Sequence, residues 1–220
     1  NGLAAAITFQ QQGLSTLLLE GADTIGGGMR TKELTLPGFQ HDVCSAIHPM
    51  AMASPFFRSL PLEAFGLDFV KPRYAAAHPL ENRESAILHH SLAETERGRG
   101  AGGVRYRKLV EKVVTLWDEL AMDIMGPLSL PKHPLTLASF GLEALQPASW
   151  TAGRFATEQA KALWAGMAAH GIQPLTNWTT SAIAIVLSAV GNKYGWQIPV
   201  GGSQSIANAL LRYYQSLGGE

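Results

Sequence analysis

The sequence predicts an α/β protein with a largely helical middle. Three observations support this fold class: a helix, a turn and a short apolar strand at the start, a run of helices between residues 101 and 194, and a glycine turn before a helix near the end. The 220 residues are enough for one substantial core or two small ones. We therefore expect four regions, at residues 1–60, 61–100, 101–194 and 195–220.

The opening segment has the pattern of a helix followed by a buried strand. Residues 2–12 combine alanines with larger apolar side chains, and Gly13 is placed to end that helix. The apolar run 15–19 lies between glycines, as expected for a buried strand, and Glu20 follows at its carboxyl end. The glycines at 26–28 then predict a loop that other backbone can approach closely.

The next segment predicts a hairpin and two short strands. Residues 33–36 and 39–43 are extended in pattern and are separated by a Pro-Gly turn. The strands are expected at residues 68–70 and 85–90.

The helical middle is predicted from apolar residues that recur every three or four positions. The helices are expected at residues 104–125, 135–145, 157–170 and 179–194. A strand at 195–199 and a helix at 203–217 follow, and the tryptophans are expected mostly in the core. The longest apolar stretch, 179–191, is shorter than the roughly 20 residues of a membrane-spanning helix, so it predicts a buried helix.

Composition argues against several classes of protein. The chain is 46% hydrophobic and 15% charged, and its 17 basic residues balance its 17 acidic ones. A nucleic-acid-binding protein would show a basic excess, and a disordered chain would be more charged and less apolar. The single cysteine, Cys44, excludes an internal disulfide and fits a reducing, cytoplasmic location.

The spacing of the opening segment indicates dinucleotide binding. In a βαβ nucleotide-binding unit, an acidic residue that binds the ribose follows the glycine fingerprint by about 20 residues. Glu20 follows Gly2 by 18 positions, which suits Gly2 as the third glycine of G-x-G-x-x-G. The first strand and first two glycines are then expected upstream of Asn1, so the sequence is expected to be a fragment. The alternative is an ordinary αβ pair with a solvated Glu20.

Two longer stretches carry a family resemblance. The string LLLEGADTIGGGMRT, continued through GFQHDVCSAIHP, and the later IPVGGSQSIANALLRYYQSLGGE resemble the phytoene desaturase-like branch of the FAD-dependent amine oxidase superfamily. The resemblance implies an incomplete FAD-binding Rossmann-like domain of the glutathione-reductase type with a largely helical substrate domain at 101–194. It also implies a chain truncated at both ends.

The resemblance implies a set of FAD-binding residues in the first part of the chain. Gly2 would let the backbone approach the pyrophosphate, and Glu20 would bind the adenosine ribose. Gly27 and Gly28 would pass close to the pyrophosphate and the ribityl chain. Arg30 would offer its charge to the phosphates, for which the fork of guanidinium donors is suited.

The resemblance also implies flavin contacts from two later segments. Residues 42–48, with Ser45 and His48, would run towards the isoalloxazine ring. His48 would serve there as a hydrogen-bond donor or proton relay, or would simply be a turn residue. Gly201 and Gly202 would approach the flavin from the other side.

The sequence departs from the family pattern at two points. A third glycine and Met29 separate the glycine pair from Arg30, which can displace the guanidinium. Cys44 stands where many relatives have glycine, and we expect a small buried hydrophobic residue rather than a covalent flavin link. The spacing of His41, His48 and Cys44 matches no zinc pattern, so no metal site is predicted.

Substrate and partners are predicted more coarsely. The apolar middle favours a small apolar substrate, with Trp164 and Met167 on one helix face as candidate contacts. No catalytic residue is predicted, because in a flavoenzyme the cofactor carries the hydride chemistry. A basic cluster is interpreted as a solvated helix entry, with a peripheral membrane contact as the alternative; its members are Arg97, Arg99, Arg105, Arg107 and Lys108.

The sequence therefore predicts an FAD-dependent oxidoreductase that transfers a hydride between flavin and a mostly apolar substrate. One alternative is a non-catalytic binding module that keeps the fold. Another is a nicotinamide-dependent dehydrogenase, against which the glycine segment after Glu20 speaks. The 220 residues by themselves are expected to bind FAD weakly and to aggregate through unpaired strand edges.

Overall fold

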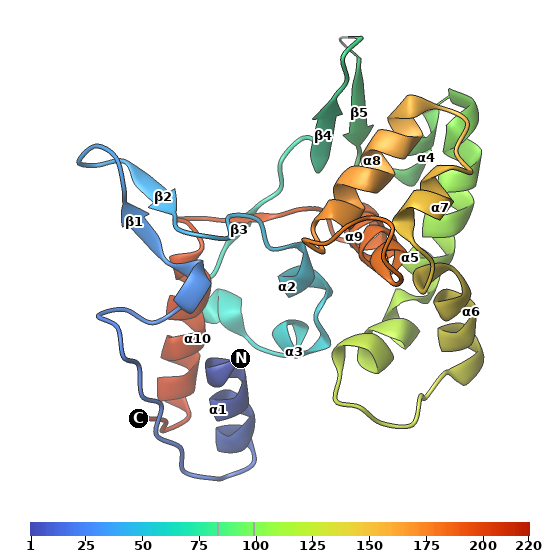
Figure 1. Ribbon diagram of the computed structural model, residues 1–220. Coiled ribbons are helices and arrows are strands. Elements are labelled where there is room, and N and C mark those ends of the chain that lie inside the picture. Colours follow the sequence, from blue (N-terminus) through green and yellow to red (C-terminus); the bar gives the residue numbers. More distant parts are fainter. Residues whose placement is uncertain (83, 99) are drawn as a thin grey trace. The chain divides into compact units, whose positions relative to one another are not determined.

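A computed structural model describes residues 1–82, 84–98 and 100–220 (Figure 1). The chain separates into two compact units. Unit 1 comprises Asn1–His48, Phe56–Lys71 and Gln197–Glu220, and unit 2 comprises Pro49–Pro55 and Pro72–Trp196. The segment 61–100, expected as a connection, is thus divided between the two units.

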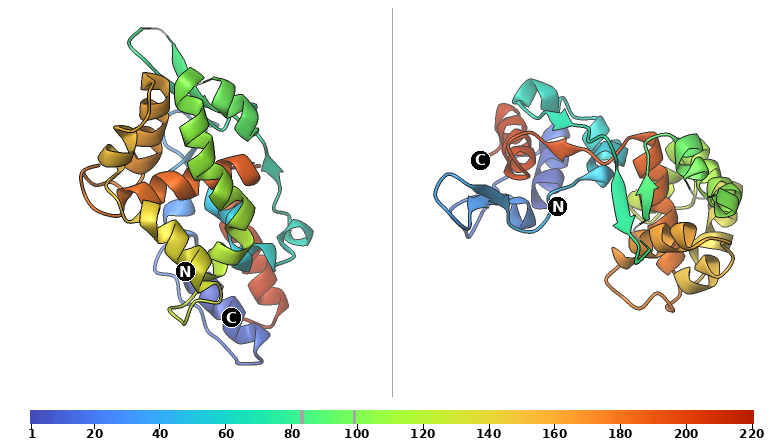
Figure 2. Two further views of the ribbon diagram at one scale, coloured as in Figure 1. Left: turned by 90° about the vertical axis from the view of Figure 1, so that its right-hand side faces the viewer. Right: turned by 90° about the horizontal axis from the view of Figure 1, so that it is seen from above.

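Unit 1 is built around two helices that pack side by side, α1 (Gly2–Gln11) and α10 (Gln204–Ser216) (Figures 1 and 2). Their interface buries Ile7, Ile206 and Tyr214. The other elements of the unit are η1 (Gly27–Met29), β1 (Thr31–Glu33), β2 (Gln40–Asp42), α3 (Pro55–Arg58, all but its first residue), η2 (Leu62–Phe65), β3 (Phe69–Val70) and β6 (Ile198–Pro199). Both helices agree with the sequence prediction to within about one residue at each end.

The prediction of a buried strand at 15–19 was wrong, because the structure forms no strand over these residues and most of their side chains are exposed. Leu17 is 68% exposed and Leu19 is 82% exposed. The Leu18 N–H donates to the Glu220 carbonyl at 2.7 Å, and the Glu220 N–H donates to the Thr16 carbonyl at 3.3 Å. These two bonds have the parallel pattern. Among the described residues only this short contact pairs with the run, so no sheet forms around it to cover its side chains.

The predicted hairpin is present with its strands displaced. β1 and β2 pair antiparallel, with Thr31 opposite Asp42 and Glu33 opposite Gln40. The residues predicted to form most of the first strand lie in the connecting loop instead, where Leu34 and Leu36 are exposed. β3 and β6 form a second antiparallel pair near the predicted positions.

Unit 2 is mainly helical. Its elements are α2 (Pro49–Ala53), β4 (Ala76–Pro79), β5 (Ser85–Leu88), α4 (Leu92–Arg97), η3 (Gly100–Gly102), α5 (Gly103–Met125), α6 (Pro134–Ala144), α7 (Ala148–Ala152), α8 (Glu158–Ala169) and α9 (Thr180–Lys193). The four predicted long helices are therefore confirmed as α5, α6, α8 and α9. Thr157 begins α8 as its N-cap, because its hydroxyl accepts the Ala160 N–H. The short helices α2, α4 and α7 were not predicted.

The core of unit 2 lies where α5, α8 and α9 pack together, and Figure 2 shows α9 crossing α5. Trp117 and Trp164 are completely buried in it. Trp150 and Trp178 instead lie at the surface with their rings in edge contact, so the prediction of a mostly core role fails for these two. No helix in the described part of the chain combines the length and apolar character needed to cross a bilayer.

Candidate functional site

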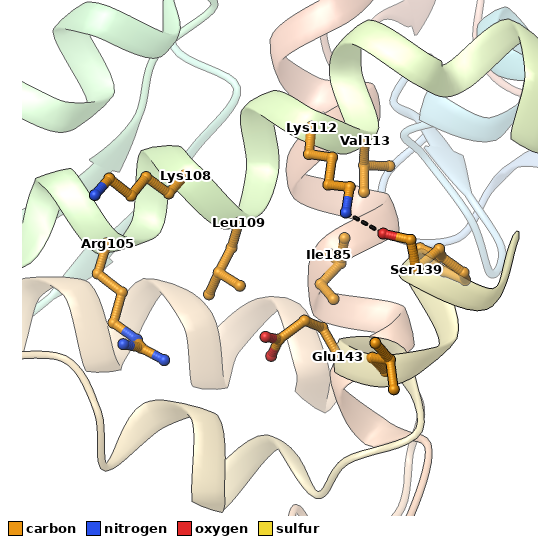
Figure 3. Close-up of a pocket in the computed structure, with 10 residues that line it drawn as sticks. Arg105, Lys108, Leu109, Lys112, Val113, Ser139, Glu143 and Ile185 are labelled. Atoms are coloured by element: carbon orange, nitrogen blue, oxygen red, sulfur yellow. Dashed lines mark hydrogen bonds between the residues drawn. The ribbon is translucent and has the colours of Figure 1, made fainter. Parts of the chain in front are cut away.

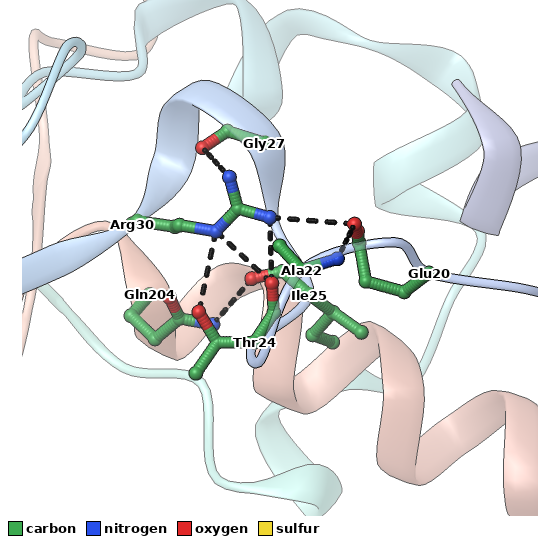
Figure 4. Close-up of polar contacts among 7 residues, drawn as sticks. All are labelled: Glu20, Ala22, Thr24, Ile25, Gly27, Arg30 and Gln204. Atoms are coloured by element: carbon green, nitrogen blue, oxygen red, sulfur yellow. Dashed lines mark hydrogen bonds and ion pairs between the residues drawn. The ribbon is translucent and has the colours of Figure 1, made fainter.

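The glycine loop of unit 1 passes directly over helix α10. A Cβ added to Gly26, whose φ is +114°, would meet the Cβ of Ala207 at 3.1 Å. The Gln204 side-chain amide donates to the Ile25 carbonyl at 3.0 Å, which ties the loop to the start of α10 (Figure 4). A Cβ added to Gly27 would meet nothing within 4 Å. The loop is thus packed on one side and open at Gly27.

Arg30 closes this loop from within (Figure 4). Its guanidinium donates to the Thr24 carbonyl from Nη2 at 2.6 Å and from Nε at 3.0 Å, and Nη1 donates to the Gly27 carbonyl at 3.4 Å. The Nη2 atom also lies 3.5 Å from Oε1 of Glu20. Most of its five N–H donors are therefore used inside the loop. The predicted role of Arg30 at the phosphates remains a prediction, and its observed role is to hold the loop and Glu20 together.

Glu20 lies where the spacing predicts it, at the end of the extended segment after α1. Its Oε1 accepts the Ala22 N–H at 3.0 Å and faces Arg30, while Oε2 makes no hydrogen bond among the described residues. Gly2 lies close to the same segment, because a Cβ added there would meet Cδ1 of Leu18 at 3.5 Å. That distance is an ordinary van der Waals contact, so the packing alone does not require a glycine at this position.

The second glycine turn lies against the hairpin. Gly201 and Gly202 both have positive φ, at +79° and +85°. A Cβ added to Gly202 would meet Oγ1 of Thr31 at 2.5 Å and Oδ1 of Asp42 at 3.0 Å, whereas one added to Gly201 would meet nothing within 4 Å. Gly202 is thus required by close packing, and Gly201 borders open space.

Asp42 joins the hairpin to the start of α10. Its Oδ1 accepts the Thr31 hydroxyl at 2.6 Å and the Ser203 N–H at 2.7 Å. The Gln204 N–H in turn donates to Oγ1 of Thr31 at 3.1 Å. These bonds satisfy N–H groups at the start of a helix, which have no partner within the helix itself, and they place a negative charge at its positive end.

Ser45 and His48 meet at Ser203, which is fully buried. The Ser203 hydroxyl donates to the Ser45 carbonyl and lies 2.8 Å from Nε2 of His48. Because a serine hydroxyl has one hydrogen, Nε2 of His48 must be the donor in the second bond. Ser45 also donates from its N–H to the Gly28 carbonyl at 3.4 Å, so both glycine segments and residues 42–48 converge.

Burial lowers the pKa of His48 below its ordinary value of 6.5, against the opposing effects of its bond to Ser45 and the charge of Asp42. The unfolded chain therefore binds this proton more readily than the folded chain. The stabilisation from neutral His48 is complete above 6.5 and is lost as the pH falls through the lowered folded value.

We expect the free energy of unfolding to decline as the pH falls below about 6.5, and the decline to be smaller in His48→Gln. Urea unfolding at a series of pH values measures both slopes. Equal slopes in the two proteins would show that His48 does not carry this pH dependence.

The structure also shows where Cys44, Trp164 and Met167 lie. Cys44 is exposed beside Gly28, so the prediction of a buried hydrophobic residue was wrong. Trp164 and Met167 are fully buried in the core of unit 2, and Nε1 of Trp164 donates to the Ala148 carbonyl at 3.1 Å. Their predicted contact with substrate remains a prediction. Across the residues that the structure describes, no group of three or more His, Cys, Asp or Glu could hold a metal ion.

Sequence reasoning missed three residues that hold the site together: Thr31, Ser203 and Gln204. A polar pair directly after a glycine turn is a signal for the start of a helix, and Ser203 and Gln204 fit it. Their partners on the hairpin, more than 150 positions earlier, had no signal in the sequence.

Comparisons with known proteins agree with this geometry. Residues 1–60 match the family model of an NAD(P)-binding Rossmann-like domain. Among solved structures, a triple mutant of putrescine oxidase from a structure-based redesign of cofactor binding is similar, with a TM-score of 0.53 and 17% identity. A single mutant from the same redesign has a TM-score of 0.52 and 18% identity. A search of curated proteins found no match.

The two structural matches each cover 98% of this chain and 46% of the other chain, so this chain spans about half the length of the structures it resembles. The match at residues 1–60 agrees with the expectation of a Rossmann-like segment at the start of the chain. The likeness to putrescine oxidase is a likeness of fold, and it is consistent with the predicted α/β class.

Proposed function

We propose that the chain is part of an FAD-dependent oxidoreductase, related to the phytoene desaturase-like branch, that transfers a hydride between flavin and a mostly apolar substrate. One observation carries this proposal. The glycine loop after Glu20 and the glycine turn before α10 are far apart in sequence, yet they converge through Gln204, Ser203 and Asp42. A dinucleotide cradle needs backbone from two segments close together with no side chain between them.

The residues present fit an adenine dinucleotide. Oε2 of Glu20 has its acceptor capacity available, as binding of ribose hydroxyls requires. Gly27 and Gly201 both border space that no protein atom fills within 4 Å of an added Cβ. Arg30 steadies the Glu20 carboxylate through the ion pair at 3.5 Å.

Each group then has a role in binding rather than in bond making. Glu20 would hold the ribose, and Gly27, Gly28, Gly201 and Gly202 would leave room for the cofactor backbone. Bound FAD would supply the hydride chemistry. The Ser45, His48 and Ser203 network would fix the second glycine turn, with the neutral His48 proton held on Nε2. The apolar helices of unit 2 favour an apolar substrate.

A nicotinamide-dependent dehydrogenase is the second candidate, because the matching family model is described as NAD(P)-binding. Titration of the product of the complete gene with FAD, NAD and NADP separates the two candidates. Visible flavin absorption in the purified protein, or uptake of added FAD, supports the first. Uptake of a nicotinamide cofactor alone supports the second, and a colourless protein that binds neither would favour a non-catalytic module.

Glu20→Gln is expected to weaken FAD binding by about tenfold, because an ionised acceptor forms stronger hydrogen bonds than a neutral amide. The measurement is the dissociation constant from quenching of flavin fluorescence in the complete gene product. Asp23→Asn is the matched control, since Asp23 is an exposed carboxylate in the same loop. Equal losses of FAD affinity in the two variants would show that Glu20 does not bind the cofactor.

A further inference from the structure

A cavity lies in unit 2, between helices α5, α6 and α9, and the residues proposed to bind the dinucleotide belong to unit 1 (Figure 3). Its volume is about 330 Å³. That volume is at the lower end of the roughly 300–1,000 Å³ typical of pockets for small molecules.

Three cations of one helix face line this cavity. Arg105, Lys108 and Lys112 follow one another on α5 at steps of three and four, which places them on the same side of the helix (Figure 3). Lys112 donates to the Ser139 hydroxyl of α6. Arg105 and Lys108 are exposed and form no ion pair or hydrogen bond with any residue that the structure describes.

The neighbouring Arg107, unlike Arg105 and Lys108, is paired with carboxylates. It forms ion pairs of 3.0 Å with Glu96 and with Glu111, and these carboxylates, Glu111 first, raise its pKa. Of the four described members of the predicted basic cluster, Arg107 is paired, and Arg105 and Lys108 are unpaired beside the cavity. The fourth, Arg97, is exposed and does not line the cavity. Arg99, another predicted member, lies outside the described residues.

The inner wall of the cavity is apolar. It is formed by Leu109 and Val113 of α5, Phe140 of α6 and Ile185 of α9. Val113 and Ile185 are buried, so this wall belongs to the hydrophobic core of the unit. A ligand that fills the cavity would cover this apolar surface.

One carboxylate is also present in the lining. Glu143 of α6 lies 3.4 Å from the Arg154 guanidinium, which partly balances its charge. Three cations against one anion leave the lining with a net charge of +2, counted from the side chains named. The cavity therefore favours an anion over a neutral or cationic ligand.

We propose that this cavity binds a small amphipathic carboxylate, with its head between Arg105 and Lys108 and its apolar body against the inner wall. The guanidinium fork suits a carboxylate head, and the apolar wall excludes a fully hydrated inorganic anion as the best ligand. This site is separate from the proposed dinucleotide site, and its test does not depend on flavin binding.

The test is isothermal titration calorimetry of the complete gene product with octanoate. We expect one-to-one binding that weakens as salt is added, because the charged groups are near the surface. Octan-1-ol, which lacks the charge, and acetate, which lacks the apolar body, are each expected to bind at least about tenfold more weakly.

Variants locate the binding. The double variant Arg105→Gln with Lys108→Gln is expected to weaken octanoate binding by about tenfold, and Lys132→Gln, an exposed cation elsewhere in unit 2, by less than about twofold. Leu142→Asn should weaken binding more than Leu135→Asn, since both side chains are exposed on α6 but only Leu142 lines the cavity. Absence of binding, equal binding of octan-1-ol, or equal effects of the paired variants would overturn the proposal.

Discussion

Gly202→Ala is expected to lower the free energy of unfolding by about 2–4 kcal/mol. Two effects add together. An L-residue at φ +85° is strained, and the new Cβ would meet the Thr31 side chain at 2.5 and 2.8 Å. Thr31 cannot simply move away, because it donates to Asp42 and accepts from the Gln204 N–H. The substitution therefore disturbs the whole junction between the hairpin and α10.

Gly201→Ala separates these two effects. Its φ of +79° imposes nearly the same backbone strain, but the added Cβ would meet nothing within 4 Å. The expected loss is about 1 kcal/mol, from the strain alone. Urea unfolding of the two variants measures the difference, and equal losses would mean that the junction yields to the extra carbon. In the complete gene product, FAD affinity should fall further in Gly202→Ala than in Gly201→Ala.

Trp164→Ala is expected to lower the free energy of unfolding by about 3–5 kcal/mol, because it would leave a large cavity in the core of unit 2. The indole also donates its N–H to the Ala148 carbonyl at 3.1 Å and lies in edge contact with Phe155. The variant therefore loses packing and leaves a buried carbonyl without that donor.

Trp178→Ala is the control, since Trp178 is 63% exposed. Its expected cost is below about 1 kcal/mol. Thermal or urea unfolding provides the comparison. If Trp164→Ala kept nearly normal stability and changed only the turnover of substrate, the residue would line a substrate passage, as the sequence suggested, instead of supporting the core.

The long helices could be predicted because the residues that specify each of them lie within the helix or next to it. The apolar spacing within residues 104–125 determines which face of α5 is buried, whatever it packs against. Thr157 gives α8 its start through a bond to a residue only three positions later. The run 15–19 lacks this independence. Its burial depends on neighbouring strands, and in the described chain its backbone pairs only with Glu220.

The candidate site also has features that could be predicted from local sequence and features that depend on distant contacts. The spacing of Gly2 and Glu20 indicated a nucleotide-binding segment, and the family match at residues 1–60 agrees with it. The contacts of Arg30 could not be predicted in this way. The resemblance assigned its charge to the phosphates, whereas in the structure its N–H groups donate to carbonyls of the loop. A guanidinium binds whichever acceptors the folded chain brings near it, and this cannot be read from its neighbours in sequence.

The sequence by itself determined the longer helices, the glycine turns and the spacing between Gly2 and Glu20, because each rests on contacts or conformations within about 20 residues. Only the tertiary structure decided that Thr31 and Asp42 meet Gly202 and Ser203, and that three cations of α5 border a cavity. Those contacts join residues distant along the chain, and their geometry is set by packing.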